Sequence, residues 1–328
     1  MLGSDSFIRG INVYLVENVI QTALVFALVL AAMRLLPIRD PNVRIRLLLL
    51  PTLIPFVAPP VYYLVFPMRR EMSVLAVDQI FDIERIVALV PYSDFFLTTV
   101  TIGMVSLGVF WALKGALSIA AMLYLPRRYR TLKRGDDPRL DGVLERTFTR
   151  AGIPSPVVLL SPESSWHCCG VGLGRAYLFV SQRCLRELNE EQLESVLTHE
   201  LAHISRGDSI FSLLLFIQRH LLFFNPFIHL IHRRIQEEIE IACDKQALSF
   251  GLNPRPYVRN LLEVWRISMA CAHEPSPLAS HVVSDKRSLE RRVSALLDPA
   301  SAQEPAWFIS WTPAFLSPAL VLGLFFLC

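Results

Sequence analysis

The feature of this sequence that most constrains its fold is a set of long stretches almost without charged side chains. Residues 47–66 and 306–328 carry no charged residue, and residues 95–125 carry a single one. Each stretch reaches the roughly 20 apolar residues that a helix needs to cross the hydrocarbon core of a bilayer. Residues 14–33 form an earlier stretch that is apolar over most of its length. We therefore predict an α-helical membrane bundle with four transmembrane helices at about these positions.

The composition supports a membrane protein and argues against several other classes. Hydrophobic residues make up 53% of the chain and charged residues 19%, whereas soluble domains carry about a quarter charged residues. The formal net charge is only +3, so we expect neither disorder nor direct nucleic-acid binding. Six cysteines in 328 residues are too few for a disulfide scaffold.

Most charged residues lie between the third and fourth apolar stretches. Residues 126–300 hold 23 of the 32 basic and 20 of the 29 acidic residues, so this part is predicted to fold as an aqueous domain. Basic clusters follow the first stretch and flank this domain, and such clusters mark the cytoplasmic side of a membrane. We expect a multi-pass protein of the inner (cytoplasmic) membrane with residues 126–305 in the cytoplasm and both termini outside. The clusters are Arg34, Arg39, Arg44 and Arg46; Arg127, Arg128, Arg130, Lys133 and Arg134; and Lys286, Arg287, Arg291 and Arg292.

The stretch at 208–231 is apolar, but we do not interpret it as a fifth span. It carries Arg219 at its centre, which is expensive in a bilayer, and Asn225-Pro226 interrupts it. We expect two apolar helical pieces, buried in the domain or lying against the membrane. The other elements predicted in the domain are helices at 137–151, 190–205 and 233–250, strands at 157–160 and 175–180, and a turn leading into a sheet edge at 161–170.

An HExxH motif runs from His199 to His203. Residues four apart lie on one face of a helix, so these two histidines can present their imidazoles to one Zn²⁺. Glu200 lies on a nearby side, where it can take a proton from a water molecule at the metal. The surrounding helix is too polar to span a membrane, so the motif belongs to the aqueous domain.

A zinc site needs a third protein ligand, and acidic residues follow 37 to 44 positions after Glu200. We prefer Glu240, flanked by Ile239 and Ile241, and keep Glu237, one turn earlier, as the alternative. Asp244 lies one turn after Glu240, where its carboxylate can accept a hydrogen bond from a ligating histidine and fix the orientation of that ring.

The elements HELAHISRGD and EIACDKQAL, in an insert between a third and a fourth span, resemble the BlaR/MecR family of membrane zinc metallopeptidases (antirepressor, β-lactam-sensor type). The resemblance covers nearly the whole chain, and EIACD is its specific part, because the related HtpX and CAAX prenyl protease family usually has Ala-Asp in place of Ala242-Cys243-Asp244. It implies an α+β gluzincin-type domain inserted between the third and fourth spans. The implied roles are His199, His203 and Glu240 as Zn²⁺ ligands, Glu200 as the general base, and Asp244 as a partner of a ligating histidine.

The same resemblance suggests two further elements of the site. In such peptidases a substrate strand commonly adds to an edge strand beside the zinc helix, and we expect that edge at residues 164–180, with Trp166, His167 and Gly170 on it. The family often has a tyrosine after the helix that carries the third ligand. We therefore place Tyr257 first as the group that stabilises the oxyanion, ahead of three histidines, His220, His229 and His232.

The sequence departs from the β-lactam sensors in one respect. Those proteins carry an extracellular penicillin-binding domain after the fourth span, and nothing here resembles its serine acylation motifs. We expect a protease without that sensor domain, so a β-lactam-sensing role does not transfer.

Three functions follow from these features. The first is a zinc endopeptidase that cleaves a cytoplasmic or membrane-associated regulatory protein, such as a transcriptional repressor, in a signalling pathway. The second is a membrane quality-control protease of the HtpX type, and the third is a non-enzymatic signal transducer with an inactive site. The expected partners are a protein or peptide substrate and membrane lipid. A separate sensor protein and a homo-oligomer are left open.

Overall fold

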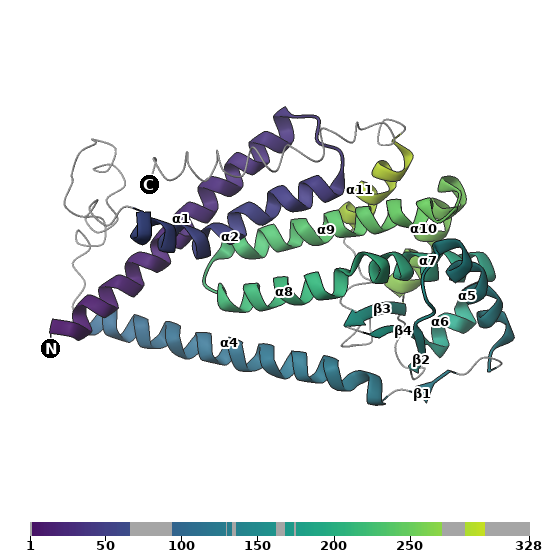
Figure 1. Cartoon of the computed structure of the whole chain (residues 1–328), viewed down its shortest axis with the longest axis horizontal. Helices are drawn as coiled ribbons and strands as arrows, with labels where there is room; N and C mark the ends of the chain where they lie inside the picture. The colour runs from purple at the N-terminus through teal and green to yellow at the C-terminus, as the bar shows by residue number, and fades with distance from the viewer. Residues whose placement is uncertain are drawn as a thin grey trace. The chain divides into compact units, whose positions relative to one another are not determined.

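The computed structural model describes residues 2–65, 94–128, 130–132, 136–161, 168–173, 175–270 and 286–298 (Figure 1). The described chain divides into two compact units. The first comprises residues 2–116 and 217–238, and the second comprises residues 117–216 and 239–298. Three helices, α4 (Asp94–Arg128), α8 (Asp208–Leu221) and α9 (Pro226–Ser249), begin in one unit and end in the other.

The first unit contains the apolar helices of the N-terminal part of the chain. They are α1 (Leu2–Leu35), α2 (Pro41–Val65) and most of α4 (Asp94–Arg128). Within the described helices, only Asn18–Leu35 is both long and apolar enough to cross a bilayer, by length and composition. A shorter apolar stretch, Ile102–Leu117, lies in α4. The four spans therefore stay a prediction, and residues 306–328 lie outside the described part of the chain.

The 208–231 stretch forms two helical pieces, as predicted, and their connection packs on α1. The side chain of Asn225 accepts a hydrogen bond from the Phe227 N–H (3.0 Å) and so caps α9, with Pro226 as its first residue. The Asn225 amide also donates to Asn18 Oδ1 (2.7 Å) and Thr22 Oγ1 (3.0 Å) of α1. The predicted helix start near Arg233 was wrong, because α9 begins at Pro226. The Asn225-Pro226 pair interrupts the apolar stretch and also starts the next helix.

The two pieces also contact α2 through polar side chains. Gln218 donates to the Thr52 carbonyl oxygen (2.9 Å), and its own amide oxygen lies 3.1 Å from His232 Nε2. Arg44 donates from Nε to Glu238 Oε1 (2.9 Å), and the Glu238 side chain is buried. Part of the predicted cytoplasmic insert, residues 217–238, thus belongs to the first unit.

The second unit is built on a four-stranded sheet in the order β1-β2-β4-β3. Strands β2 and β4 are parallel, and β3 runs antiparallel to β4 at the edge of the sheet. The strands are β1 (Arg130–Thr131), β2 (Val157–Ser161), β3 (Cys168–Leu173) and β4 (Arg175–Ser181); the helices that begin in this unit are α5 (Pro138–Ala151), α6 (Gln182–Glu187), α7 (Glu190–Arg206), α8, α10 (Pro254–Ala270) and α11 (Lys286–Leu297). Gly170 and Gly172 lie within β3, at the edge of the sheet, and Gly170 is one of the residues predicted on that edge.

The core of this unit joins the sheet to the helix that carries the HExxH motif. Leu178 of β4 and Leu193 and Leu197 of α7 are fully buried in one cluster with side chains of α5 and α6. Burial of each such leucine stabilises the fold by about 1.5–3 kcal/mol. The packing holds α7 against β3 and β4, where the candidate site lies.

Candidate metal centre

Local sequence signals fix the position of α7. Asn189 accepts a hydrogen bond from the Gln192 N–H (2.9 Å), and the Gln192 side chain accepts one from the Asn189 N–H (3.0 Å), which forms a capping box. Gly207 ends the helix in the left-handed conformation (φ 70°). The helix therefore begins and ends almost where the sequence predicts, and its face carries His199 and His203 one turn apart.

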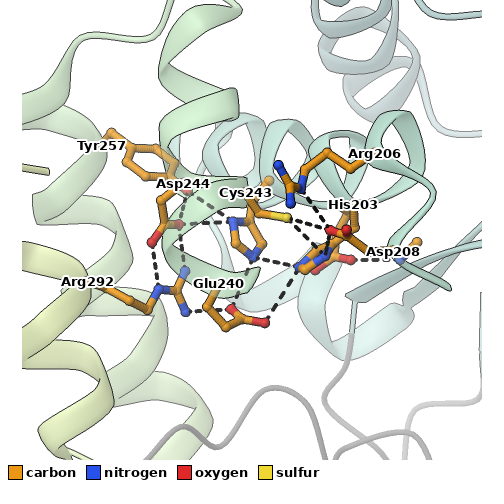
Figure 2. A network of polar contacts seen from close by, with 11 residues as sticks. His203, Arg206, Asp208, Glu240, Cys243, Asp244, Tyr257 and Arg292 are labelled. Atoms are coloured by element: carbon orange, nitrogen blue, oxygen red, sulfur yellow. Dashed lines mark hydrogen bonds and ion pairs between the residues drawn. The ribbon is translucent and has the colours of Figure 1, made fainter. Parts of the chain in front are cut away.

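Helix α9 brings Glu240 to these two histidines. The Nε2 atoms of His199 and His203 lie 3.2 Å apart, and the Glu240 carboxylate oxygens lie 3.4 Å from the first and 3.6 Å from the second. All three residues are half-buried, so the donors remain reachable from solvent. Figure 2 shows Glu240 below His203, with its carboxylate pointing toward that ring.

The spacing of these donors fits a tetrahedral metal site. With bonds of about 2.0–2.2 Å to nitrogen and oxygen, a tetrahedral Zn²⁺ separates its ligand atoms by about 3.3–3.6 Å. The observed separations of 3.2–3.6 Å are close to this value, and Glu240 faces His199 with Oε2 and His203 with Oε1. Two imidazoles and one carboxylate are also a donor set that leaves a fourth position for water or substrate.

Asp244, one turn after Glu240, contacts the Nδ1 atom of His199. We call Nδ1 the outer nitrogen of each histidine, because the Nε2 atoms are the ones that converge with Glu240. The Asp244 Oδ1 atom lies 3.0 Å from His199 Nδ1, and the carboxylate is fully buried. Tyr257 of α10 donates from its hydroxyl to the same oxygen (2.7 Å) and lies 3.2 Å from His199 Nδ1. The Tyr257 hydroxyl is therefore beside the outer nitrogen of the ring and away from the Nε2 atoms that converge with Glu240.

His203 has its own carboxylate partner, which the sequence reasoning missed. Asp208 Oδ2 lies 3.0 Å from His203 Nδ1 and accepts hydrogen bonds from Cys243 Sγ (2.9 Å) and Arg206 Nε (3.2 Å). The turn at Gly207 brings Asp208 back under the ring. The signal in the sequence is an acidic residue directly after Gly207, the glycine that follows the helix of the HExxH motif.

Arg292 of α11 is the second residue that the sequence reasoning missed. Its guanidinium donates from Nε and Nη2 to the two oxygens of Asp244 (2.7 Å each), and Nη1 lies 3.0 Å from Glu240 Oε2. The side chain is buried. In the sequence Arg292 belongs to a basic cluster that we had used only to orient the membrane spans, and no spacing links it to the motif.

Glu200 and the sheet edge contact each other directly. The Gly170 N–H donates to Glu200 Oε2 (2.7 Å), and a Cβ atom at Gly170 would lie 2.7 Å from the Glu200 carbonyl oxygen, so only glycine allows this approach. The next outward N–H of β3, that of Gly172, donates to Ser209 Oγ (2.9 Å). Two other residues predicted on this edge, Trp166 and His167, lie outside the described residues.

The remaining candidates lie elsewhere. Glu237 pairs with Arg233 on its own helix (3.5 Å) and is absent from the cluster of donors. The three histidines considered beside Tyr257 belong to the first unit and have other neighbours there: His220 contacts Trp111, His229 lies 3.0 Å from Arg219 Nε, and His232 contacts Gln218.

Neighbouring groups keep the two carboxylates of the site ionised. Burial raises the pKa of Asp244, but Arg292 and His199 outweigh it and lower that pKa to about 2. Burial likewise opposes ionisation of Glu240, whose pKa Arg292 and the two histidines hold well below its usual range. Burial lowers the pKa of His199, but hydrogen bonds to Asp244 and Glu240 raise it to about 10. The carboxylates are thus ionised and available as ligands.

Comparison with known proteins gives a family match and several partial relatives. The family model described as BlaR1 peptidase M56 matches residues 47–296. A protease HtpX homolog of Pelotomaculum thermopropionicum is 33% identical over 116 residues, which cover 35% of this chain and 38% of that protein. Another, of Gemmatimonas aurantiaca, is 34% identical over 77 residues, 23% of this chain and 28% of that protein.

A more distant match is the methicillin resistance mecR1 protein of Staphylococcus aureus. It is 22% identical over 123 residues, which cover 37% of this chain and 21% of that protein. The chain spans less than two fifths of the length of each of these three relatives.

Proposed function

Because the chain belongs to the BlaR1 peptidase M56 family, we propose that it is a membrane-bound zinc endopeptidase. The observation that carries this proposal is the convergence of two Nε2 atoms and one carboxylate at separations of 3.2–3.6 Å, with Glu200 on the same helix. His199, His203 and Glu240 would hold Zn²⁺. When bound, Zn²⁺ supplies Lewis acidity that lowers the pKa of a water molecule and polarises a peptide carbonyl.

Each remaining residue then has a definite task. Glu200 accepts the proton of the attacking water and passes it to the leaving amine of the substrate. Asp244 and Asp208 hold the outer nitrogens of His199 and His203 and so fix the orientation of both rings. For Tyr257 we propose a positioning task through Asp244 in place of the predicted oxyanion role, because its hydroxyl lies on the outer side of His199.

The substrate is proposed to bind as an extended segment along β3. Strand β3 lies at the edge of the sheet and touches Glu200 through Gly170. An added strand would pair with the outward N–H groups of Gly170 and Gly172, which donate to Glu200 and Ser209. Strand addition would then release the Glu200 carboxylate for proton transfer.

We propose the membrane arrangement that the sequence predicts, with four spans and residues 126–305 in the cytoplasm. The long apolar stretch Asn18–Leu35 and the basic clusters after the first and third apolar stretches support it. Accessibility of single introduced cysteines to a membrane-impermeant reagent, in whole cells and in inverted vesicles, would test it. Labelling of a cysteine at Ser249 from outside the cell would contradict it.

Two substrate classes have support in different relatives. The family name and the mecR1 protein favour a regulatory target such as a transcriptional repressor. The HtpX homologs, which are more similar in sequence, favour a quality-control protease that degrades damaged membrane proteins. Comparison of protein N-termini in cells with wild-type and Glu200→Gln protein separates the classes: one dominant new terminus indicates a regulator, and many indicate quality control.

The catalytic step is tested in vitro with fluorescein-casein, which presents extended segments. The Glu200→Gln variant should retain Zn²⁺ and lose about 10²–10⁴-fold in kcat, the usual contribution of a general base. Glu194→Gln, on the same helix and paired with Arg150, is the matched control and should leave kcat unchanged. Proteolysis by purified Glu200→Gln protein at the wild-type rate would overturn the proposal.

A further inference from the structure

Arg292 connects two carboxylates of the site to α11. One guanidinium makes two hydrogen bonds of 2.7 Å to Asp244 and a 3.0 Å contact to Glu240 Oε2. In Figure 2 it reaches both acidic groups from the helix on the left, on the side away from His203. The planar fork of arginine suits such a double contact, and lysine cannot reproduce it.

Both partners of Arg292 act on the proposed metal site. Glu240 supplies one ligand, and Asp244 holds the ring of another. Asp244 is fully buried, and removal of one partner of a buried ion pair leaves an uncompensated charge. Arg292 also restrains the Glu240 carboxylate from one side, while its oxygens lie 3.4 and 3.6 Å from the histidine Nε2 atoms.

Arg292 reaches the site only when α11 is packed against α9 and α10. Leu296 of α11 is buried in a cluster with Ala247 of α9 and with Tyr257 and Val258 of α10. Its neighbour Leu297 is 52% exposed and lies outside this cluster. The apolar contact that docks α11 is therefore one turn away from the polar contact that Arg292 makes.

We propose that docking of α11 is a condition for tight metal binding, with Arg292 as the positioning residue that transmits it. The proposal rests on the proposed function, because it concerns the same site. Helix α11 precedes residues 306–328, which the sequence predicts as the fourth span. A signal that displaces α11 would consequently weaken the metal site and lower proteolysis without touching a ligand.

The first test measures Zn²⁺ affinity of the metal-free, purified full-length protein in detergent, by competition with a chelating dye. Arg292→Met should weaken Zn²⁺ binding about 10–100-fold, the usual effect of losing a partner of a ligand. Arg292→Lys should restore part of the loss, because it supplies the charge without the fork. Arg287→Met removes an exposed arginine of the same helix and should match the wild type.

The second test undocks α11 without changing a polar group. Leu296→Ala should weaken Zn²⁺ binding in the same direction as Arg292→Met, whereas Leu297→Ala should not. The visible absorption of Co²⁺-loaded protein reports the ligand geometry and should change in Leu296→Ala and Arg292→Met. Wild-type affinity and spectrum in these two variants would overturn the inference.

The outcomes separate this inference from the proposed function. A wild-type protein that binds no stoichiometric Zn²⁺ would refute the proposed function itself. A wild-type protein that binds one Zn²⁺, with undiminished affinity in Arg292→Met, would refute only the role of Arg292. If Arg292→Met does not accumulate as folded protein, the Zn²⁺ affinities of Arg292→Lys and Leu296→Ala test the inference instead. Wild-type Zn²⁺ affinity in both of these variants would overturn it.

Discussion

Each unit of the molecule contains a buried polar network that joins helices, and these two networks differ in kind, although the first unit also buries the charged Glu238 beside Arg44. In the first unit, Asn225 is fully buried and donates hydrogen bonds to neutral oxygen atoms of Asn18 and Thr22. In the second, the fully buried Asp244 is bonded to Arg292 and lies beside His199. Both networks join helices that are distant in sequence, but only the second brings together groups that carry charge.

This difference indicates what each network is for. Neutral amides and hydroxyls satisfy one another without the large desolvation cost of ions, so they suit helices that pack in apolar surroundings. Paired charges are costly to bury, but they hold ligands and attract a cation. We therefore expect changes in the charged network to alter metal binding and changes in the neutral network to alter stability.

The largest expected effect is on the charged network, through Asp208. Asp208→Asn should weaken Zn²⁺ binding about 10–100-fold, because the carboxylate holds the outer nitrogen of His203. Competition with a chelating dye measures it, and Asp136→Asn, an exposed acid, is the control. An unchanged affinity would show that the ring of His203 is fixed without its carboxylate.

A smaller effect of the opposite kind is expected from Asn225. Asn225→Ala should lower the free energy of unfolding by about 1–3 kcal/mol, because it leaves buried partners unsatisfied, and it should leave Zn²⁺ affinity unchanged. Unfolding in mixed detergent micelles gives the first quantity and dye competition the second. A fall in Zn²⁺ affinity would contradict the division between the two networks.

The smallest effect is expected at Ser209, a neutral group beside the charged centre. Ser209→Ala removes the group that competes with substrate for the Gly172 N–H. The KM for fluorescein-casein should fall about 2- to 12-fold, the equivalent of a hydrogen bond of about 0.5–1.5 kcal/mol, at unchanged kcat. Ser212→Ala, one turn further along α8, should have no effect. A raised KM would mean that Ser209 assists substrate binding.

The sequence predicted the parts of the fold and site that depend on neighbouring residues. The caps at Asn189 and Gly207 act within one turn of the chain, and the i, i+4 spacing places His199 and His203 on one face. Glu240 and Asp244 share that local geometry on α9. Such features follow from helix periodicity and turn chemistry, so they could be identified without a structure.

The missed residues depend on contacts between distant elements. Arg292 is 48 positions from Asp244 and reaches it only because α11 packs on α10. Tyr257 was identified, but the side of His199 on which it lies is set by the path of α10. Asp208 is near in sequence, yet its direction depends on the backbone at Gly207. Periodicity carries no information about any of these contacts.

The most direct test of the proposed metal centre compares two glutamates on one helix. Zinc content of purified full-length Glu240→Gln and Glu237→Gln proteins, measured by mass spectrometry of the metal, distinguishes the two candidate ligands. The convergence of Glu240 with His199 and His203 predicts one Zn²⁺ per chain in wild type and Glu237→Gln, and little or none in Glu240→Gln. Full zinc content in Glu240→Gln, or its loss in Glu237→Gln, would contradict the account.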